Sequence, residues 1–272
     1  MTVEQGFVAA GDVRLETFTA GPADARPVVL VHGAGSSARI WHTVQIELAE
    51  ERIRTIAIGM RGAGGSDHTP NNEDYHPSNY ARDLIAALDA LNVQQFVLVG
   101  HSLGTLVASY VARDHRDRLD ALVQVAGPAP DREGRRPSQP SAGGRTGGGY
   151  RASTDEDELE HWRSQHLGLP DDVRDQLRRD IDNNSEQRRV GQGAPWPGAA
   201  EVGPALDIPT LVLLGDADDV VSPEGPLQYY LGLPEAVRHL QVLHGVGHYP
   251  NAQTPRAVAR TLRRFLRDEV DR

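Results

Sequence analysis

The chain has 272 residues, with 28 basic and 38 acidic side chains and a formal net charge of -10 at pH 7. This acidic balance argues against nucleic acid or an anionic membrane surface as the main partner. No stretch approaches the roughly 20 apolar residues that a membrane-spanning helix needs. Because Glu4, Asp12 and Glu16 stand where a signal peptide would be basic and then apolar, we expect a cytoplasmic protein.

Cysteine and lysine are both absent, so all 28 basic residues are arginine. The lack of cysteine excludes disulfides, thiolate nucleophiles and thiolate metal ligands. The lack of lysine excludes Schiff-base catalysis and Ser–Lys dyads. The nucleophiles and bases that remain for covalent catalysis are therefore chiefly serine, histidine and the carboxylates.

Short apolar runs alternate with amphipathic segments through the first half of the chain. The apolar runs are β-branched or leucine-rich, as in buried strands, and cover residues 28–31, 53–58, 96–99 and 122–125. The segments between them have helical periodicity and cover residues 41–50, 80–91 and 103–114. Strands that alternate with helices predict a parallel sheet covered by helices on both faces.

This alternation breaks off after Gly127. Residues 127–150 consist largely of Gly, Pro, Ser and Arg, and they predict a loop with little apolar surface to bury. Two charged segments with helical periodicity follow, and we predict helices at 153–167 and 171–181. Neither predicted helix has the wide apolar face that would receive a long lipid chain.

The sheet pattern resumes near Pro209. The elements predicted beyond this point are strands at 210–214 and 238–243 and a final amphipathic helix at about 256–270. We therefore predict one α/β core formed by residues 1–127 and 206–272, with residues 128–205 inserted into it as a helical lid.

The segment Val99-Gly100-His101-Ser102-Leu103-Gly104 connects a predicted strand to a predicted helix. It fits the G-x-S-x-G pattern of a nucleophile elbow, in which a tight turn lifts the serine hydroxyl clear of the sheet. Gly100 and Gly104 fit because larger side chains would collide with neighbouring backbone there. The helix that starts behind Ser102 would direct free N–H groups at a developing oxyanion. The same pattern alone also fits an inert strand-to-helix turn.

A second glycine-rich loop, Val31-His32-Gly33-Ala34-Gly35, follows the first predicted parallel strand. Acyl transfer needs two N–H donors for the oxyanion, one after the nucleophile and one from this earlier loop. We expect the backbone amides of Leu103 and Ala34 to be these donors. We interpret the side chains of His32 and His101 as packing or hydrogen-bonding groups, with Gly33 completing the loop motif.

A serine nucleophile needs a general base, which is held in turn by an acid. His248 follows the last predicted strand and precedes the final helix, and we predict that it is the base. His244 is its nearest rival, although it belongs to the strand end. Asp216, Asp218 and Asp219 follow the preceding strand, and the residues alone leave open which of them is the acid.

The chain order Ser, Asp, His at the carboxyl ends of strands resembles the α/β-hydrolase superfamily, in its single-domain esterase, lactonase and cofactor-free haloperoxidase branch. The resemblance extends to the arginine–glycine loop at residues 60–66, to the link at residues 115–119 and to the histidine loop at residues 247–250. It selects Asp218 as the acid, because Asp218 stands three residues after Gly215.

This resemblance implies a serine hydrolase that cleaves an ester, lactone or thioester of a small to medium substrate. Ser102 would be the nucleophile, His248 the base and Asp218 the orienting acid, with no metal and no cofactor. Serine at the elbow, where dehalogenases and epoxide hydrolases of this fold have aspartate, argues against their chemistry. Two alternatives stay open: non-hydrolytic use of the triad (cofactor-free oxygenation, perhydrolysis, or a lyase or cyclase step), and a non-catalytic ligand-binding protein.

Overall fold

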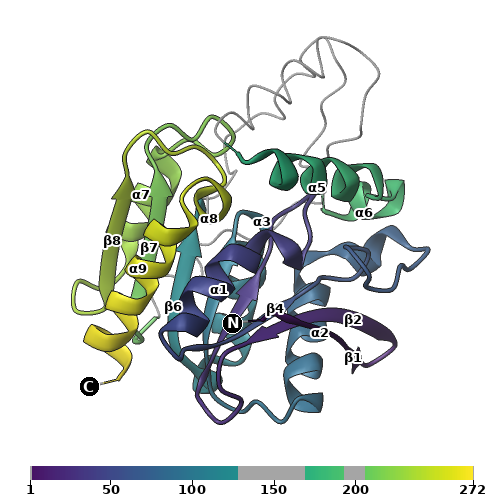
Figure 1. Cartoon of the computed structure of the whole chain (residues 1–272), viewed down its shortest axis with the longest axis horizontal. Coiled ribbons are helices and arrows are strands. Elements are labelled where there is room, and N and C mark those ends of the chain that lie inside the picture. Colours follow the sequence, from purple (N-terminus) through teal and green to yellow (C-terminus); the bar gives the residue numbers. More distant parts are fainter. Residues whose placement is uncertain (1, 128–168, 193–205, 272) are drawn as a thin grey trace.

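The computed structural model of the protein describes residues 2–127, 169–192 and 206–271. Its centre is an eight-stranded sheet in the order β1-β2-β4-β3-β5-β6-β7-β8 (Figure 1). The strands are β1 (Glu4–Ala10), β2 (Val13–Ala20), β3 (Pro27–Val31), β4 (Arg54–Ile58), β5 (Phe96–His101), β6 (Leu119–Val125), β7 (Thr210–Gly215) and β8 (Arg238–Leu243). All neighbours from β4 to β8 pair in parallel. The predicted parallel sheet is thus confirmed.

Helices cover both faces of this sheet. The α-helices in the described part of the chain are α1 (His42–Glu50), α2 (Pro77–Ala90), α3 (Leu103–Asp114), α5 (Asp171–Asp182), α6 (Glu186–Gln192), α7 (Glu224–Gly232), α8 (Pro250–Gln253) and α9 (Pro255–Phe265). Short 3-10 turns lie at η1 (Ala38–Trp41), η2 (Asn72–Tyr75) and η3 (Arg116–Arg118).

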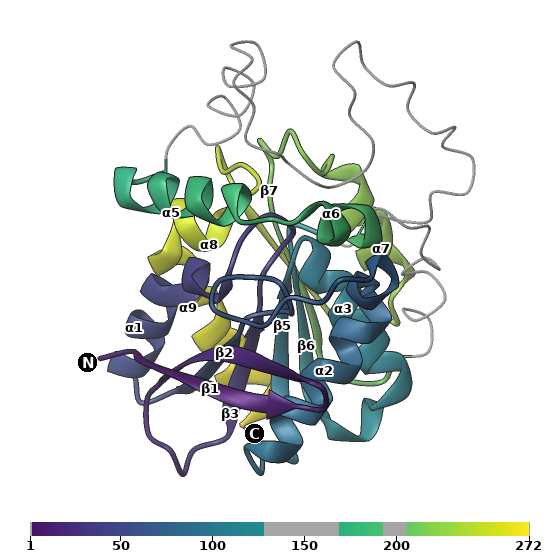
Figure 2. The same ribbon diagram turned by 90° about the vertical axis from the view of Figure 1, so that its right-hand side faces the viewer.

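Side chains alternate between the two faces along each buried strand. On β5, Leu98 belongs to the core that packs against α2 and α3, whereas Val97 and Val99 belong to the core against α1 and α9. The two faces are therefore both apolar, which explains why the parallel strands are continuous hydrophobic runs in the sequence. Figure 2 shows α5 and α6 lying across one end of this sheet.

Several features of the architecture were not predicted from the sequence. They include the antiparallel pairing of β1 with β2 and of β2 with β4, the helices α6 and α7, and the π-helical geometry of η6 (Leu266–Val270). The helix predicted at about 256–270 is α9 continued by η6, and apolar periodicity does not distinguish an α turn from a π turn. α6 has only 7 residues, too few for a periodic signal.

The loop predicted at 127–150 and the helix predicted at 153–167 lie outside the described residues, apart from Gly127. The helix predicted at 171–181 is α5. Both boundaries of the predicted insertion also lie outside the described residues, so the division into core and lid stays a prediction. In the described part of the chain, no helix is long and apolar enough to cross a membrane.

Candidate active site

The turn at Ser102 joins β5 to α3 in a conformation that few residues adopt. Ser102 has φ 51° and ψ -115°, outside the regions that L-residues favour, and its N–H donates to the carbonyl of Val125 at 2.9 Å. A Cβ added to Gly100 would lie 2.2 Å from the carbonyl oxygen of Gly104, and one on Gly104 would lie 2.6 Å from that of Val31. Glycine is therefore required at both positions for the strand and helix to approach so closely.

Ser102 begins a chain of hydrogen bonds through two side chains from distant loops. Its hydroxyl lies 3.0 Å from Nε2 of His248, and Nδ1 of His248 lies 2.9 Å from Oδ2 of Asp218. Both the imidazole and the carboxylate are buried. The arrangement fits a His248 tautomer whose Nδ1–H donates to Asp218 and whose Nε2 accepts the serine proton.

Asp218 is fixed by its own loop. Its second oxygen, Oδ1, accepts hydrogen bonds from the backbone amides of Val220 and Val221, each at 2.9 Å. Both carboxylate oxygens are thus engaged, one by the loop backbone and one by the imidazole. Such a carboxylate can hold the imidazole in one orientation and stabilise the positive charge that it acquires as a base.

The rival residues form a separate pair on the surface. Nδ1 of His244 lies 2.6 Å from Oδ2 of Asp216, and the His244 side chain is 98% exposed. The hydrogen bond from His244 lowers the pKa of the Asp216 carboxyl. Asp219 is exposed as well. Only Asp218, of the three acids, contacts His248.

The loop after β3, residues 32–37, passes close to Ser102, and we refer to it as the β3 loop. A Cβ added to Gly33 would lie 3.0 Å from Cβ of Ser102 and 2.9 Å from Nδ1 of His101. In the described part of the chain, no backbone carbonyl accepts a hydrogen bond from the amide of Ala34 or of Leu103. Neither amide therefore has a backbone partner among the described residues.

His32 and His101 are buried supports of this arrangement. Burial lowers the pKa of each imidazole to about 3, so both are neutral at pH 7. Nδ1 of His32 donates to the carbonyl of Gly33 at 2.8 Å, and its Nε2 accepts from the amide of Met60 at 3.1 Å. His101 donates through Nε2 to the carbonyl of His248 at 2.7 Å.

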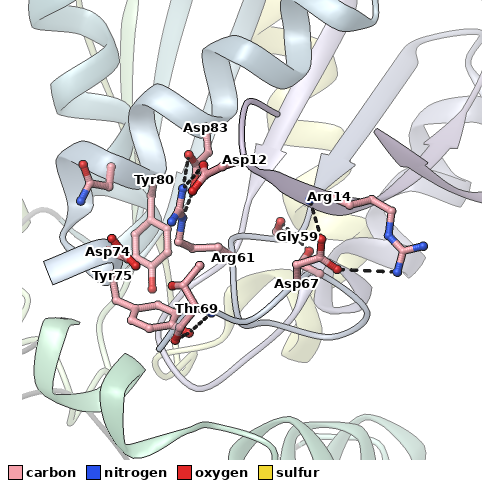
Figure 3. Close-up of polar contacts among 12 residues, drawn as sticks. Asp12, Arg14, Gly59, Arg61, Asp67, Thr69, Asp74, Tyr75, Tyr80 and Asp83 are labelled. Carbon is pink, nitrogen blue, oxygen red and sulfur yellow. Dashed lines mark hydrogen bonds and ion pairs between the residues drawn. The ribbon is translucent and has the colours of Figure 1, made fainter. Parts of the chain in front are cut away.

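The β4 loop, residues 59–67, lies beside the β3 loop and is held by a buried ion pair (Figure 3). The Arg61 guanidinium donates to both carboxylate oxygens of Asp83, at 2.5 and 2.7 Å, and both side chains are buried. It also reaches Asp12 at 3.4 Å. Asp83 was not predicted as a site residue, although its spacing of three residues from Tyr80 and four from Ala87 places it on the buried face of α2.

Two buried charges from α5 and α6, Asp180 and Arg188, also reach the β3 loop and were missed by the sequence analysis. They stand in strongly charged segments, where burial leaves no signal in the sequence. Across the described residues, no cluster of three or more histidine or carboxylate side chains is arranged to hold a metal ion.

The chain is similar to several known proteins. The "Putative carbamate hydrolase RutD" of Escherichia coli O44:H18 is 37% identical over 105 residues, which are 39% of this chain and 38% of that protein. The chain therefore matches about two fifths of the length of this curated relative.

Two solved structures are similar over nearly their whole length. The esterase RhEst1 from Rhodococcus sp. ECU1013 superposes with a TM-score of 0.78 at 25% identity, over 99% of this chain and 100% of that chain. A thermophilic esterase from Thermogutta terrifontis has a TM-score of 0.73 at 24% identity, over 98% and 99% of the two chains. The model of the alpha/beta hydrolase fold family matches residues 26–253. This chain belongs to the α/β-hydrolase fold family.

Proposed function

We propose that the protein is a serine hydrolase that cleaves carboxylic esters, lactones or thioesters of small to medium molecules through an acyl-enzyme. The observation that carries the proposal is the continuous hydrogen-bonded chain from Ser102 through His248 to Asp218. A serine hydroxyl is a weak nucleophile unless a base accepts its proton. In this hydrogen-bonded chain His248 would be the base, and Asp218 the acid that orients it.

The proposed reaction has two halves. In acylation, Ser102 Oγ adds to the substrate carbonyl carbon while its proton passes to Nε2 of His248. The oxyanion that forms accepts hydrogen bonds from the amides of Ala34 and Leu103, and His248 then protonates the leaving group. In deacylation, water gives a proton to His248 as its oxygen adds to the acyl carbon. The bond from the acyl carbon to Ser102 Oγ then breaks, and His248 returns the proton to Oγ, which releases the acid and restores Ser102.

The family contains several chemistries, and the matched relatives differ in the bond that their names describe. A carbamate is a further candidate substrate, because RutD, to which the chain is similar over part of its length, is named a putative carbamate hydrolase. Carbamates and esters share the acyl carbon that Ser102 would attack. The class of acyl group therefore has to be decided by assay.

Two measurements test the proposal. A fluorophosphonate probe should label the wild-type protein at Ser102 and leave Ser102→Ala unlabelled, as read by peptide mass mapping. A panel of chromogenic esters, lactones, thioesters and carbamates should show turnover by the wild type that is lost in Ser102→Ala. Labelling of another serine, or equal turnover by the alanine variant, would contradict the assignment. Absence of turnover with intact labelling would favour non-hydrolytic use of the same triad.

A further inference from the structure

Helix α5 places a buried carboxylate on the β3 loop. Oδ2 of Asp180 accepts a hydrogen bond from the hydroxyl of Ser37 at 2.8 Å, and its Oδ1 accepts from Nε2 of Gln176 at 2.8 Å. Asp180 is only 5% exposed, and burial raises the pKa of its carboxyl. A buried carboxylate is costly unless its oxygens are hydrogen-bonded, and one of its two partners here is a residue of the β3 loop.

Helix α6 places a buried guanidinium on the same loop, one residue away. Nη2 of Arg188 donates to the carbonyl of Ser36 at 3.4 Å, and its Nη1 donates to the carbonyl of Gly62 at 3.2 Å. Arg188 is 1% exposed, and among the described residues it forms no ion pair with a carboxylate. Its charge is instead attracted to Asp180 through space.

The β3 loop is thus contacted by two opposite charges at consecutive residues. At the residue before them, Ile181 of α5 packs against the loop, because a Cβ added to Gly35 would lie 3.5 Å from Cγ1 of Ile181. Gly35 has φ +66°, so the loop reverses direction there. Helices α5 and α6 therefore hold the loop at three successive positions, Gly35, Ser36 and Ser37.

The other end of the Arg188 contact is anchored. Gly62 belongs to the β4 loop, which the Arg61–Asp83 pair fastens to α2 (Figure 3). At its other end, the amide of Asp67 donates to the carbonyl of Arg14 on β2 at 2.9 Å, and the Asp67 carboxylate accepts from the amide of Arg14 at 2.9 Å. Because the β4 loop is held at both ends, the guanidinium of Arg188 ties the β3 loop to a fixed support.

We propose that Asp180 and Arg188 are positioning residues for the oxyanion hole. Ala34, whose amide is the expected donor, stands two residues before Ser36, so a displacement of Ser36 and Ser37 moves this amide away from the reacting oxygen. A preorganised donor contributes most to rate when it is fixed before the reaction, and loss of one such donor lowers kcat by roughly 100-fold to 1000-fold. The inference rests on the proposed acyl-transfer function and deepens it.

The test compares Arg188→Met and Asp180→Ala with the exposed control Arg174→Gln, which lies on α5 and, among the described residues, pairs with Asp171. We expect kcat for a good ester substrate to fall about 10-fold to 100-fold in the first two variants, with KM within about twofold. The control should keep the wild-type kcat. Arg188→Lys and Asp180→Asn, which keep a donor and an acceptor respectively, should recover much of the loss.

A ligand pair separates positioning from general stability. With a trifluoromethyl ketone, Ser102 Oγ adds to the carbonyl carbon and the serine proton passes to His248. The carbonyl oxygen takes the π electron pair and becomes an oxyanion. The affinity of the trifluoromethyl ketone should fall by the same factor as kcat, whereas the affinity of the matching methyl ketone, which binds as an uncharged carbonyl, should change little.

Three outcomes would overturn the inference. The first is a fall in melting temperature with unchanged kcat and unchanged trifluoromethyl ketone affinity of the folded enzyme. The second is an equal loss for both ketones, which would assign the two residues to ground-state substrate binding. The third is a failure of the lysine and asparagine variants to recover activity while folded. If Arg188→Met does not fold, Asp180→Ala carries the same comparison. Failure of the fluorophosphonate test would overturn the proposed function itself, before any of these variants is needed.

Discussion

Nε2 of His101 lies 2.7 Å from the carbonyl oxygen of His248, so the residue that precedes Ser102 holds the backbone of the residue expected to act on it. The rings of these two histidines are 5.1 Å apart, and the His101 ring also lies 5.4 Å from that of Tyr249. The two loops that meet at Ser102 are thereby joined by one hydrogen bond and by ring packing.

His101→Phe removes that hydrogen bond while retaining an aromatic ring. We expect kcat to fall about 10-fold, because the His248 backbone is no longer fixed, and the unfolding free energy to fall by about 1–3 kcal/mol because a buried carbonyl loses its donor. His101→Gln, which can still donate, should lose less of both. Ester turnover and urea denaturation measure kcat and the unfolding free energy of both variants. Equal losses in His101→Phe and His101→Gln would show that the hydrogen bond is unimportant.

Asp218→Asn should lower kcat by roughly 10⁴-fold, since the amide no longer stabilises the imidazolium or fixes the productive tautomer. Asp216→Asn is the matched control, because Asp216 pairs with His244, whose side chain is 98% exposed. This variant should change kcat by no more than about twofold. Turnover of the same ester by the two purified variants decides the matter. A severe loss in Asp216→Asn with a mild one in Asp218→Asn would move the acid to the surface pair.

The buried neutral His32 should make stability depend on pH. Burial lowers its pKa in the folded protein to about 3 from the ordinary histidine value of 6.5, so the unfolded chain binds more protons between these pH values. The contribution of His32 to the free energy of unfolding is complete above pH 6.5. Below pH 6.5 this contribution falls by about 1.4 kcal/mol per pH unit. Urea denaturation at pH 7.5 and 5.0 should therefore show a smaller loss for His32→Gln than for wild type. The difference between the two proteins removes the contributions of all other titrating groups, and equal losses would contradict the assigned pKa.

Gly104→Ala should destabilise the fold by at least about 3 kcal/mol, because the added Cβ would lie 2.6 Å from the carbonyl oxygen of Val31 and overpack a backbone contact. Gly232→Ala is the control in another helix. Nothing lies within 4 Å of a Cβ there, and alanine should be neutral or stabilise by up to about 1 kcal/mol. Thermal and urea unfolding of the two variants test the contrast, which fails if both glycines tolerate alanine.

Asp83→Ala should cost about 3–5 kcal/mol of unfolding free energy, since it leaves the Arg61 guanidinium buried without its bidentate partner. Asp67→Ala breaks the neighbouring pair with Arg14, whose side chains are 60% and 44% exposed, and should cost about 0–1 kcal/mol for the ion pair. Denaturation midpoints of the two variants provide the comparison. Similar costs would show that burial does not distinguish these pairs.

The sequence by itself determined the local elements of the parallel core and the turn at Ser102. Apolar periodicity marks α3 at its observed bounds, and a Cβ on Gly100 would collide with the backbone of Gly104 and Thr105 in the same turn. These features depend on neighbouring residues, so they can be read from neighbouring letters. The antiparallel β1–β2 pair was missed, because β1 exposes most of one face and has no continuous apolar run.

Tertiary structure decided which side chains meet. His248 is 146 residues from Ser102, and Arg188 is 152 residues from Ser36. Asp216 and Asp218 lie on one acidic loop, and from the sequence only the family resemblance favoured Asp218 as the acid. In the fold, the Asp218 carboxylate contacts His248, and the Asp216 carboxylate contacts the exposed His244. Charged residues such as Asp180 and Arg188 carry no periodic signal of burial in a helix with many charges. The packing of α5 and α6 on the β3 and β4 loops buries these two side chains, because burial depends on what an element packs against and not on its own sequence.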